Sequence, residues 1–164
     1  TVFSDSALLE RADWKSTLTE VWHSPKEIAK AVHSENMTLD WYEALMKKEK
    51  DRCRYLYASS DRDYLLSSFQ NEIVTGEFRT SEEAQEDFKQ RLIRMKERFL
   101  SLPQPVHFFF YDWKNVLSYG GGTVHTAVRQ PQYYQMTPDG CNMAQWLNDA
   151  VHGTPHDVGM YLVQ

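Results

Sequence analysis

Residues 81–102 read SEEAQEDFKQRLIRMKERFLSL and decide how the N-terminal part of the chain is interpreted. Apolar side chains recur here at the three- and four-residue spacing of one helical face, with Glu, Lys and Arg on the opposite face. The apolar positions are Phe88, Leu92, Met95, Phe99 and Leu102. Thr80 or Ser81 can cap the first turn, where Glu82 and Glu83 place negative charge at the positive end of the helix dipole. The stretch predicts an amphipathic helix.

Four further helices are predicted upstream from the same kind of pattern. They are expected over residues 14–22, over residues 24–35, over residues 38–57, and from Ser60 or Asp61 to a C-terminal cap at Gly76. The fold class expected from the sequence is therefore α+β but predominantly α. Its N-terminal part is a bundle of about five amphipathic helices.

The chain changes character at Leu102-Pro103-Gln104-Pro105. Residues 1–102 hold 16 of the 18 Lys and Arg, whereas residues 103–164 hold six of the seven glycines and five of the six prolines. Such turn-punctuated sequence indicates short elements joined by loops. Strands are expected at 106–111, 123–129 and 158–163, a loop at 120–122 and a helix at 142–151. We interpret residues 1–164 as one domain, in which 1–102 form a helical layer and the 103–164 segment packs on it.

Composition and charge exclude several classes of function. A net charge of -5 disfavours a nucleic-acid-binding protein, which needs clustered basic side chains against the phosphates. No apolar run approaches the ~20 residues that cross a bilayer, so we expect a soluble protein, with the cytoplasm slightly favoured. The two cysteines, Cys53 and Cys141, are too few for a disulfide framework. They are expected as free thiols, although a single bridge between them is possible.

Cys141 is the strongest candidate for a reactive side chain. It follows Gly140 and opens a predicted helix, and a helix N-terminus stabilises the thiolate that a nucleophile requires. The alternative is that Cys141 has only a structural role, as a small buried residue at the start of a helix. No residue pattern predicts a metal site or a cofactor, because the His152 and His156 pair is interrupted by Gly153 and Pro155.

The spacing of Gln135 and Cys141 resembles that of the SUMO-protease and YopJ-like cysteine enzymes. The resemblance implies that Gln135 helps to bind an oxyanion and that Cys141 is the nucleophile. It further implies His125 or His107 as the base, with Asp112 orienting the histidine. The resemblance covers about 35 residues, and Asn142 stands where that family usually has Gly.

The chain also has a surplus of aromatic residues, with five Trp, nine Tyr and eight Phe. Aromatic side chains are enriched where proteins contact partners. The tyrosines outside the predicted helical faces are Tyr55, Tyr119, Tyr133 and Tyr134. They are expected either to form an exposed contact surface or to be buried between the tail and the helices.

Two functions are therefore expected, and the sequence leaves open whether the protein is an enzyme. The leading one is a non-catalytic protein-binding module, such as an adaptor, an assembly subunit, or an effector or immunity-type protein, whose partner is another protein. The alternative is a cysteine-dependent hydrolase or acyltransferase that uses Cys141. The sequence does not indicate the partner or the oligomeric state.

Overall fold

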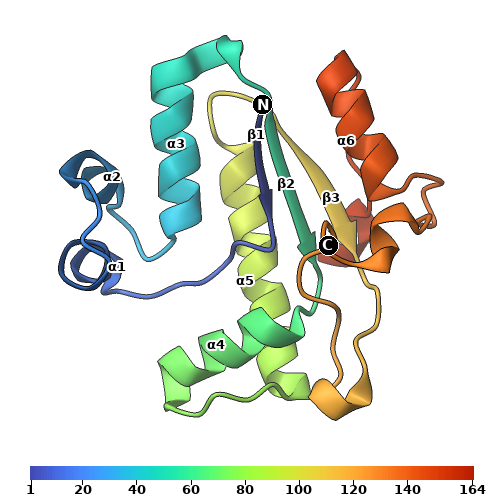
Figure 1. The fold of residues 1–164 in the computed structure, drawn as a ribbon, viewed down its shortest axis with the longest axis horizontal. Coiled ribbons are helices and arrows are strands. Elements are labelled where there is room, and N and C mark those ends of the chain that lie inside the picture. Colours follow the sequence, from blue (N-terminus) through green and yellow to red (C-terminus); the bar gives the residue numbers. More distant parts are fainter.

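The computed structural model describes residues 1–164, and its centre is a three-stranded parallel sheet. The strands are β1 (Val2–Asp5), β2 (Tyr55–Ser60) and β3 (Val106–Tyr111), in the spatial order β1-β2-β3 (Figure 1). In the register, Tyr55 of β2 lies between Val2 of β1 and Val106 of β3. All six residues of β2 are buried, as expected for a central parallel strand covered on both faces.

The predicted N-terminal five-helix bundle is wrong. Two of the three strands lie in residues 1–102, and the helix expected over residues 38–57 ends at Glu49. A single 3-10 turn, η2 (Lys50–Arg52), follows it and leads into β2. The reason is that a short, fully buried parallel strand has no alternating pattern, so YLYASS reads equally well as one more helical turn.

The first crossover, from β1 to β2, contains the helical elements α1 (Trp14–Ser16), the π-helical turn η1 (Thr17–Val21), α2 (Lys26–Ala31) and α3 (Met37–Glu49). A small apolar cluster separate from the two larger ones is formed by Trp14 of α1, Leu18 of η1, Ala29 of α2 and Val32, the residue after α2. Figure 1 shows this unit standing apart from the sheet, beyond α3. It is therefore a satellite of the main core.

The second crossover contains α4 (Tyr64–Thr75) and α5 (Glu82–Leu100). The predicted helix over residues 81–102 is confirmed as α5, with Ser81 accepting a hydrogen bond from the Ala84 amide as its N-cap. Asp63 caps α4, rather than Ser60 or Asp61, and Gly76 ends it in the left-handed conformation as predicted.

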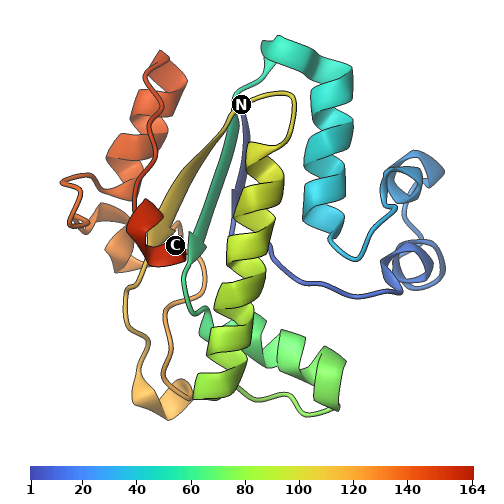
Figure 2. The ribbon, with the colours of Figure 1, turned by 180° about the vertical axis from the view of Figure 1, so that it is seen from behind.

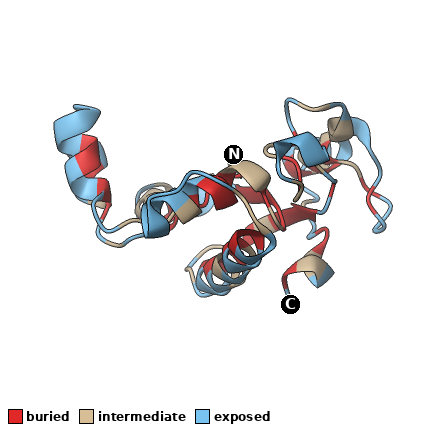
Figure 3. Ribbon diagram, turned by 90° about the horizontal axis from the view of Figure 1, so that it is seen from below, coloured by how far each residue is buried: buried red, intermediate tan, exposed pale blue.

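Helices cover both faces of the sheet (Figures 2 and 3). On one face, Tyr42 of α3 and Phe88 and Phe99 of α5 pack with Tyr57 and Phe108 of the sheet in the larger apolar cluster. The strand residues whose side chains point to the other face of the sheet pack against α6 (Met143–His152). These are Leu56, Ala58, Phe109 and Tyr111 of the sheet with Met143, Trp146 and Ala150 of α6.

The segment after β3 is mostly irregular. Its 3-10 turns are η3 (Leu117–Tyr119), η4 (Pro131–Tyr134) and η5 (Met160–Val163). The strands predicted at 123–129 and 158–163 are absent, and only isolated bridges occur there, such as Phe109 with Val158. The helix predicted at 142–151 is confirmed as α6. None of the helices combines the length and the apolar character needed to cross a membrane.

Candidate functional site

The three strands end at one edge of the sheet, because they are parallel. This carboxyl edge is where open parallel sheets bind ligands. β1 ends at Asp5, β2 at Ser60 and β3 at Tyr111 (Figure 1). The irregular segment 123–128 crosses this edge and adds His125. The residues that gather here form the carboxyl-edge cluster, namely Asp5, Ser6, Asp63, Tyr111, His125 and Thr126.

Asp5 ties this crossing segment to the sheet. Its Oδ2 accepts hydrogen bonds from the backbone amides of Ala127 at 2.7 Å and Val128 at 3.0 Å. Its Oδ1 accepts from the hydroxyls of Tyr111 at 3.1 Å and Ser6 at 3.3 Å. Burial raises the pKa of the Asp5 carboxyl above its ordinary value, although these four hydrogen bonds oppose the shift.

Two residues of the cluster have strained backbone conformations. Ser6 has φ 56° and Thr126 has φ 54°, in the left-handed region that β-branched residues such as Thr rarely adopt. The two are linked directly, because the Thr126 amide donates to Ser6 Oγ at 3.3 Å. Strain of this kind persists only where the surrounding structure imposes it, and it concentrates at functional sites.

His125 and Asp63 form a histidine–carboxylate pair. His125 Nδ1 lies 2.9 Å from Asp63 Oδ2, and the Asp63 side chain is fully buried whereas that of His125 is 24% exposed. The other carboxylate oxygen, Oδ1, accepts from the amides of Leu65 and Leu66 at the start of α4. The helix N-terminus therefore fixes Asp63, and Asp63 in turn orients the imidazole.

The electrostatics of the pair favour the imidazolium form of His125. Burial lowers the pKa of His125, but the hydrogen bond to Asp63 and the negative charges of Asp63 and Asp5 outweigh it, so the pKa is raised above 6.5. A carboxylate only accepts hydrogen bonds, so the proton of the neutral imidazole lies on Nδ1. Nε2 has no hydrogen-bond partner in the protein and is left as a free acceptor.

An apolar hollow of about 220 Å³ adjoins the cluster. It shares Ser6 with the cluster, and another of its walls is Leu66, whose amide donates to Asp63. Trp14 and Trp22 also line it, with their ring centroids 5.9 Å apart. The site therefore has a polar, ionisable part, which is the carboxyl-edge cluster, and an apolar part, which is the hollow lined by the two tryptophan rings.

Buried polar atoms without partners lie beside the cluster, at the end of β2. Ser60 Oγ and Asp61 Oδ1 are both buried and make no hydrogen bond within the protein. Burial raises the pKa of Asp61, and the nearby positive charge of Arg62 opposes that shift. Such unpaired groups are rare in folded proteins.

Cys141 lies elsewhere, in the apolar cluster between the sheet and α6. It is 4% exposed, and its Sγ donates to the carbonyl of Asn142. Burial raises the pKa of the thiol, and the charges of Asp149 and Asp139 add to the shift. Neither His107 nor His125 makes a hydrogen bond to Cys141, because His107 lies by Asp157 and His125 by Asp63.

Two other residues of that predicted set, Gln135 and Asp112, are not paired with Cys141 or with either histidine. Gln135 and Asp112 are exposed, and neither side chain makes a hydrogen bond within the protein. Cys53 and Cys141 are both free thiols. Among the residues of the cysteine-enzyme hypothesis, the structure places only His125 in the carboxyl-edge cluster.

The four candidate tyrosines do not share one environment. Tyr55 is 1% exposed in β2, so it does not belong to an exposed surface. Tyr119 and Tyr134 are 64% and 72% exposed, respectively. Tyr133 is half-buried, with its ring 4.9 Å from that of Tyr134.

Sequence reasoning missed Asp5, Ser6, Asp63 and Tyr111. One signal was present, since the acidic or hydroxyl residues of VFSDS and YASSDRD directly follow short apolar runs. Had those runs been interpreted as parallel strands, these residues would have been placed together at the carboxyl edge.

No group of three or more His, Cys, Asp or Glu side chains in residues 1–164 is arranged to hold a metal ion. Comparisons with protein-family models, with curated proteins and with solved structures found no match to this chain. The fold and the cluster together define a protein with a small parallel sheet, helices on both faces, and a histidine–carboxylate pair at the carboxyl edge.

Proposed function

We propose that this chain is an enzyme that performs general acid–base chemistry on a small molecule at the carboxyl edge of its sheet. The observation that carries the proposal is the His125–Asp63 pair, in which a fully buried carboxylate lies 2.9 Å from a partly exposed imidazole. A base held in one orientation by a second group, with its other nitrogen free, is the arrangement used by hydrolases and transferases.

In the proposed reaction, His125 Nε2 removes a proton from a water molecule or a substrate hydroxyl. The oxygen forms a bond to an electrophilic carbon or phosphorus atom. The bond from that atom to the leaving group then breaks, and the imidazolium gives its proton to the leaving group, which departs with the electron pair. Asp63 stabilises the positive charge on His125 while the proton is held there. The hollow that contains Trp14 and Trp22 would accept an apolar or aromatic part of the substrate.

Hydrolysis of p-nitrophenyl acetate tests this proposal without knowledge of the natural substrate. The ester reacts with water to give acetate and p-nitrophenolate. We expect His125→Gln to lower the protein-dependent rate by about 100-fold, the lower end of the ~10²–10⁴-fold that a positioned acid or base supplies. A circular-dichroism melt of each variant verifies that it is folded.

His152→Gln is the matched control for this assay. His152 is exposed, and its Nδ1 lies 2.8 Å from the carbonyl of Asn148 rather than near a carboxylate. The rate of this variant should equal that of the wild type. If His125→Gln hydrolyses the ester as fast as the wild type, the proposed role of His125 is wrong.

A second candidate function is binding to another protein, the function favoured by the sequence. The turn around η3 supports it, because Val116, Leu117 and Tyr119 are 54%, 89% and 64% exposed, respectively. Exposed apolar side chains gathered in one turn are typical of a contact surface. In that case Leu117→Ser should abolish co-purification of a partner without lowering the melting temperature, and unchanged co-purification would exclude this turn.

A further inference from the structure

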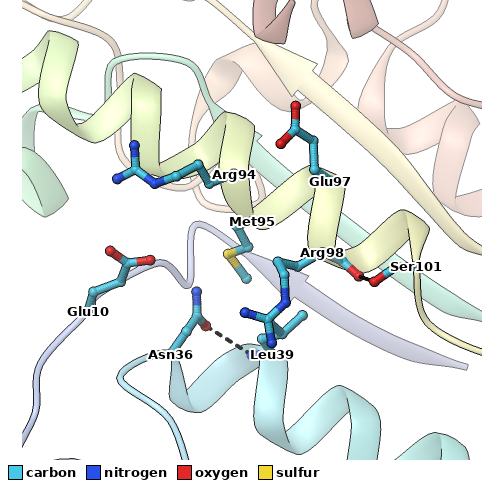
Figure 4. Close-up of a pocket in the computed structure, with 8 residues that line it drawn as sticks. All are labelled: Glu10, Asn36, Leu39, Arg94, Met95, Glu97, Arg98 and Ser101. Carbon is cyan, nitrogen blue, oxygen red and sulfur yellow. Dashed lines mark hydrogen bonds between the residues drawn. The ribbon is translucent and has the colours of Figure 1, made fainter.

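A second hollow, of about 510 Å³, lies between α3 and α5 on the face of the sheet opposite α6 (Figure 4). Its apolar lining comes from Leu39 of α3 and Met95 of α5. Its polar lining includes Arg94 and Arg98 of α5 and Asn36 at the start of α3. None of these residues belongs to the carboxyl-edge cluster.

Arg94 and Arg98 carry positive charges that the protein does not neutralise. They are four residues apart and so project from neighbouring positions on α5. Both are exposed and neither takes part in an ion pair. Arg91, one turn earlier, is the contrast, because it binds Glu10 at 2.6 Å and Asp87 at 2.7 Å.

Asn36 adds a donor at the floor of the hollow. Its side chain is buried, with 8% of the residue exposed, and its Oδ1 accepts from the Leu39 amide to cap α3. Its Nδ2 donates to no protein atom, and Figure 4 shows this nitrogen pointing into the hollow. The positive end of the dipole of the 13-residue helix α3 lies at the same place.

The acidic residues of the hollow do not cancel this positive charge. Glu10 is already neutralised by Arg91. Glu97 is on α5 between the two free arginines in sequence, but Figure 4 shows its carboxylate pointing away from Arg98 and Asn36. Figure 4 shows the Arg94 guanidinium directed away from Arg98 and Asn36. The groups that remain together for a ligand are therefore the Arg98 guanidinium and the Asn36 amide donor.

From this arrangement we propose that the hollow between α3 and α5 binds a phosphate group carried by a small molecule. A guanidinium group forms paired hydrogen bonds with phosphate oxygens, and the doubly charged phosphate gains more from Arg98 and from the positive end of the α3 dipole than a carboxylate does. Asn36 Nδ2 would donate to a further oxygen. The inference is independent of the chemistry proposed for His125.

Titration of the whole chain with inorganic phosphate, followed by two-dimensional ¹H–¹⁵N NMR, tests the proposal. We expect saturable shifts of the Asn36 side-chain amide and of the first amides of α3. Arg98→Gln should weaken phosphate binding by about tenfold, the loss of one charge-assisted hydrogen bond. A parallel titration with acetate tests whether the hollow prefers a carboxylate ligand, and acetate should bind more weakly than phosphate.

Two variants distinguish specific binding of phosphate in the hollow from non-specific electrostatic attraction to exposed positive charges. Asn36→Asp keeps the oxygen that caps α3 but removes the Nδ2 donor and adds negative charge, so it should fold normally and lose phosphate binding. Arg52→Gln removes an exposed positive charge that lies just beyond the other end of α3, where it is paired with Glu49, and this variant should bind as the wild type does. Absence of saturable shifts, equal binding of acetate, unchanged binding by Asn36→Asp, or equal weakening by Arg52→Gln would each overturn the proposal.

Discussion

Asp5 shows how a single side chain can hold a site together at the cost of its own desolvation. Its two oxygens accept four hydrogen bonds from Ser6, Tyr111, Ala127 and Val128, which belong to three separate segments of the chain. A neutral side chain without acceptors would leave these donors unpaired. These four hydrogen bonds stabilise the carboxylate form of Asp5, although burial raises the pKa of the side chain.

Substitutions of Asp5 should separate the acceptor role from the charge. Asp5→Ala leaves the Ala127 and Val128 amides without a partner, which we expect to lower the free energy of unfolding by about 1–3 kcal/mol. Asp5→Asn keeps one oxygen for the two amides, and its Nδ2 can donate to the hydroxyls, so it should cost less. Urea unfolding measures both variants. Equal losses for Ala and Asn would show that the charge, rather than the acceptors, matters.

At the scale of elements, the last part of the chain is held against β3 by a close backbone approach at Gly159. The Phe110 amide donates to the Val158 carbonyl at 2.9 Å, and the Val158 amide donates to the Phe108 carbonyl at 2.9 Å. Gly159 has φ 73°, and a Cβ at this position would overlap the carbonyl oxygen of Phe110. Only glycine satisfies both the backbone conformation and the space.

Gly159→Ala should therefore destabilise the protein strongly, and Gly140→Ala is its matched control. Gly140 has a similar φ of 75°, but a Cβ there would meet no atom within 4 Å. We expect Gly140→Ala to cost about 1–2 kcal/mol from the left-handed conformation alone, and Gly159→Ala to cost several kcal/mol, with ~4 kcal/mol marking the exceptional range. Similar melting temperatures for the two variants would contradict the close packing of Gly159 on β3.

Helices were more predictable from the sequence than strands. The helix at 81–102 was recognisable from its spacing and caps, and the strand at 106–111 from its run of aromatic residues. β1 has only four residues and β2 follows α3 after a single 3-10 turn, so neither offered a periodicity of its own. The pairing of β1 with β2 depends on contacts between residues far apart in the chain, and the spacing of apolar residues within a short stretch does not predict such contacts.

At the scale of the whole molecule, the topology creates the candidate site. Asp63 and His125 are 62 residues apart in sequence, and Asp5 lies more than a hundred residues before the amides that it accepts from. The sequence pointed to His125 through an unrelated hypothesis about Cys141, but it gave no indication that Asp63 is its partner. The parallel order of β1, β2 and β3 and the irregular segment 123–128 that crosses their carboxyl ends bring these residues to one edge.

The central claim, that His125 is a general base oriented by Asp63, is tested most directly by the pH dependence of p-nitrophenyl acetate hydrolysis. Only neutral His125 accepts a proton, so the wild-type rate should rise with pH through an apparent pKa above 6.5. Asp63→Asn keeps an oxygen to cap α4 but removes the negative charge, so the apparent pKa should fall. A profile that is the same in the wild type and in Asp63→Asn would contradict the claim.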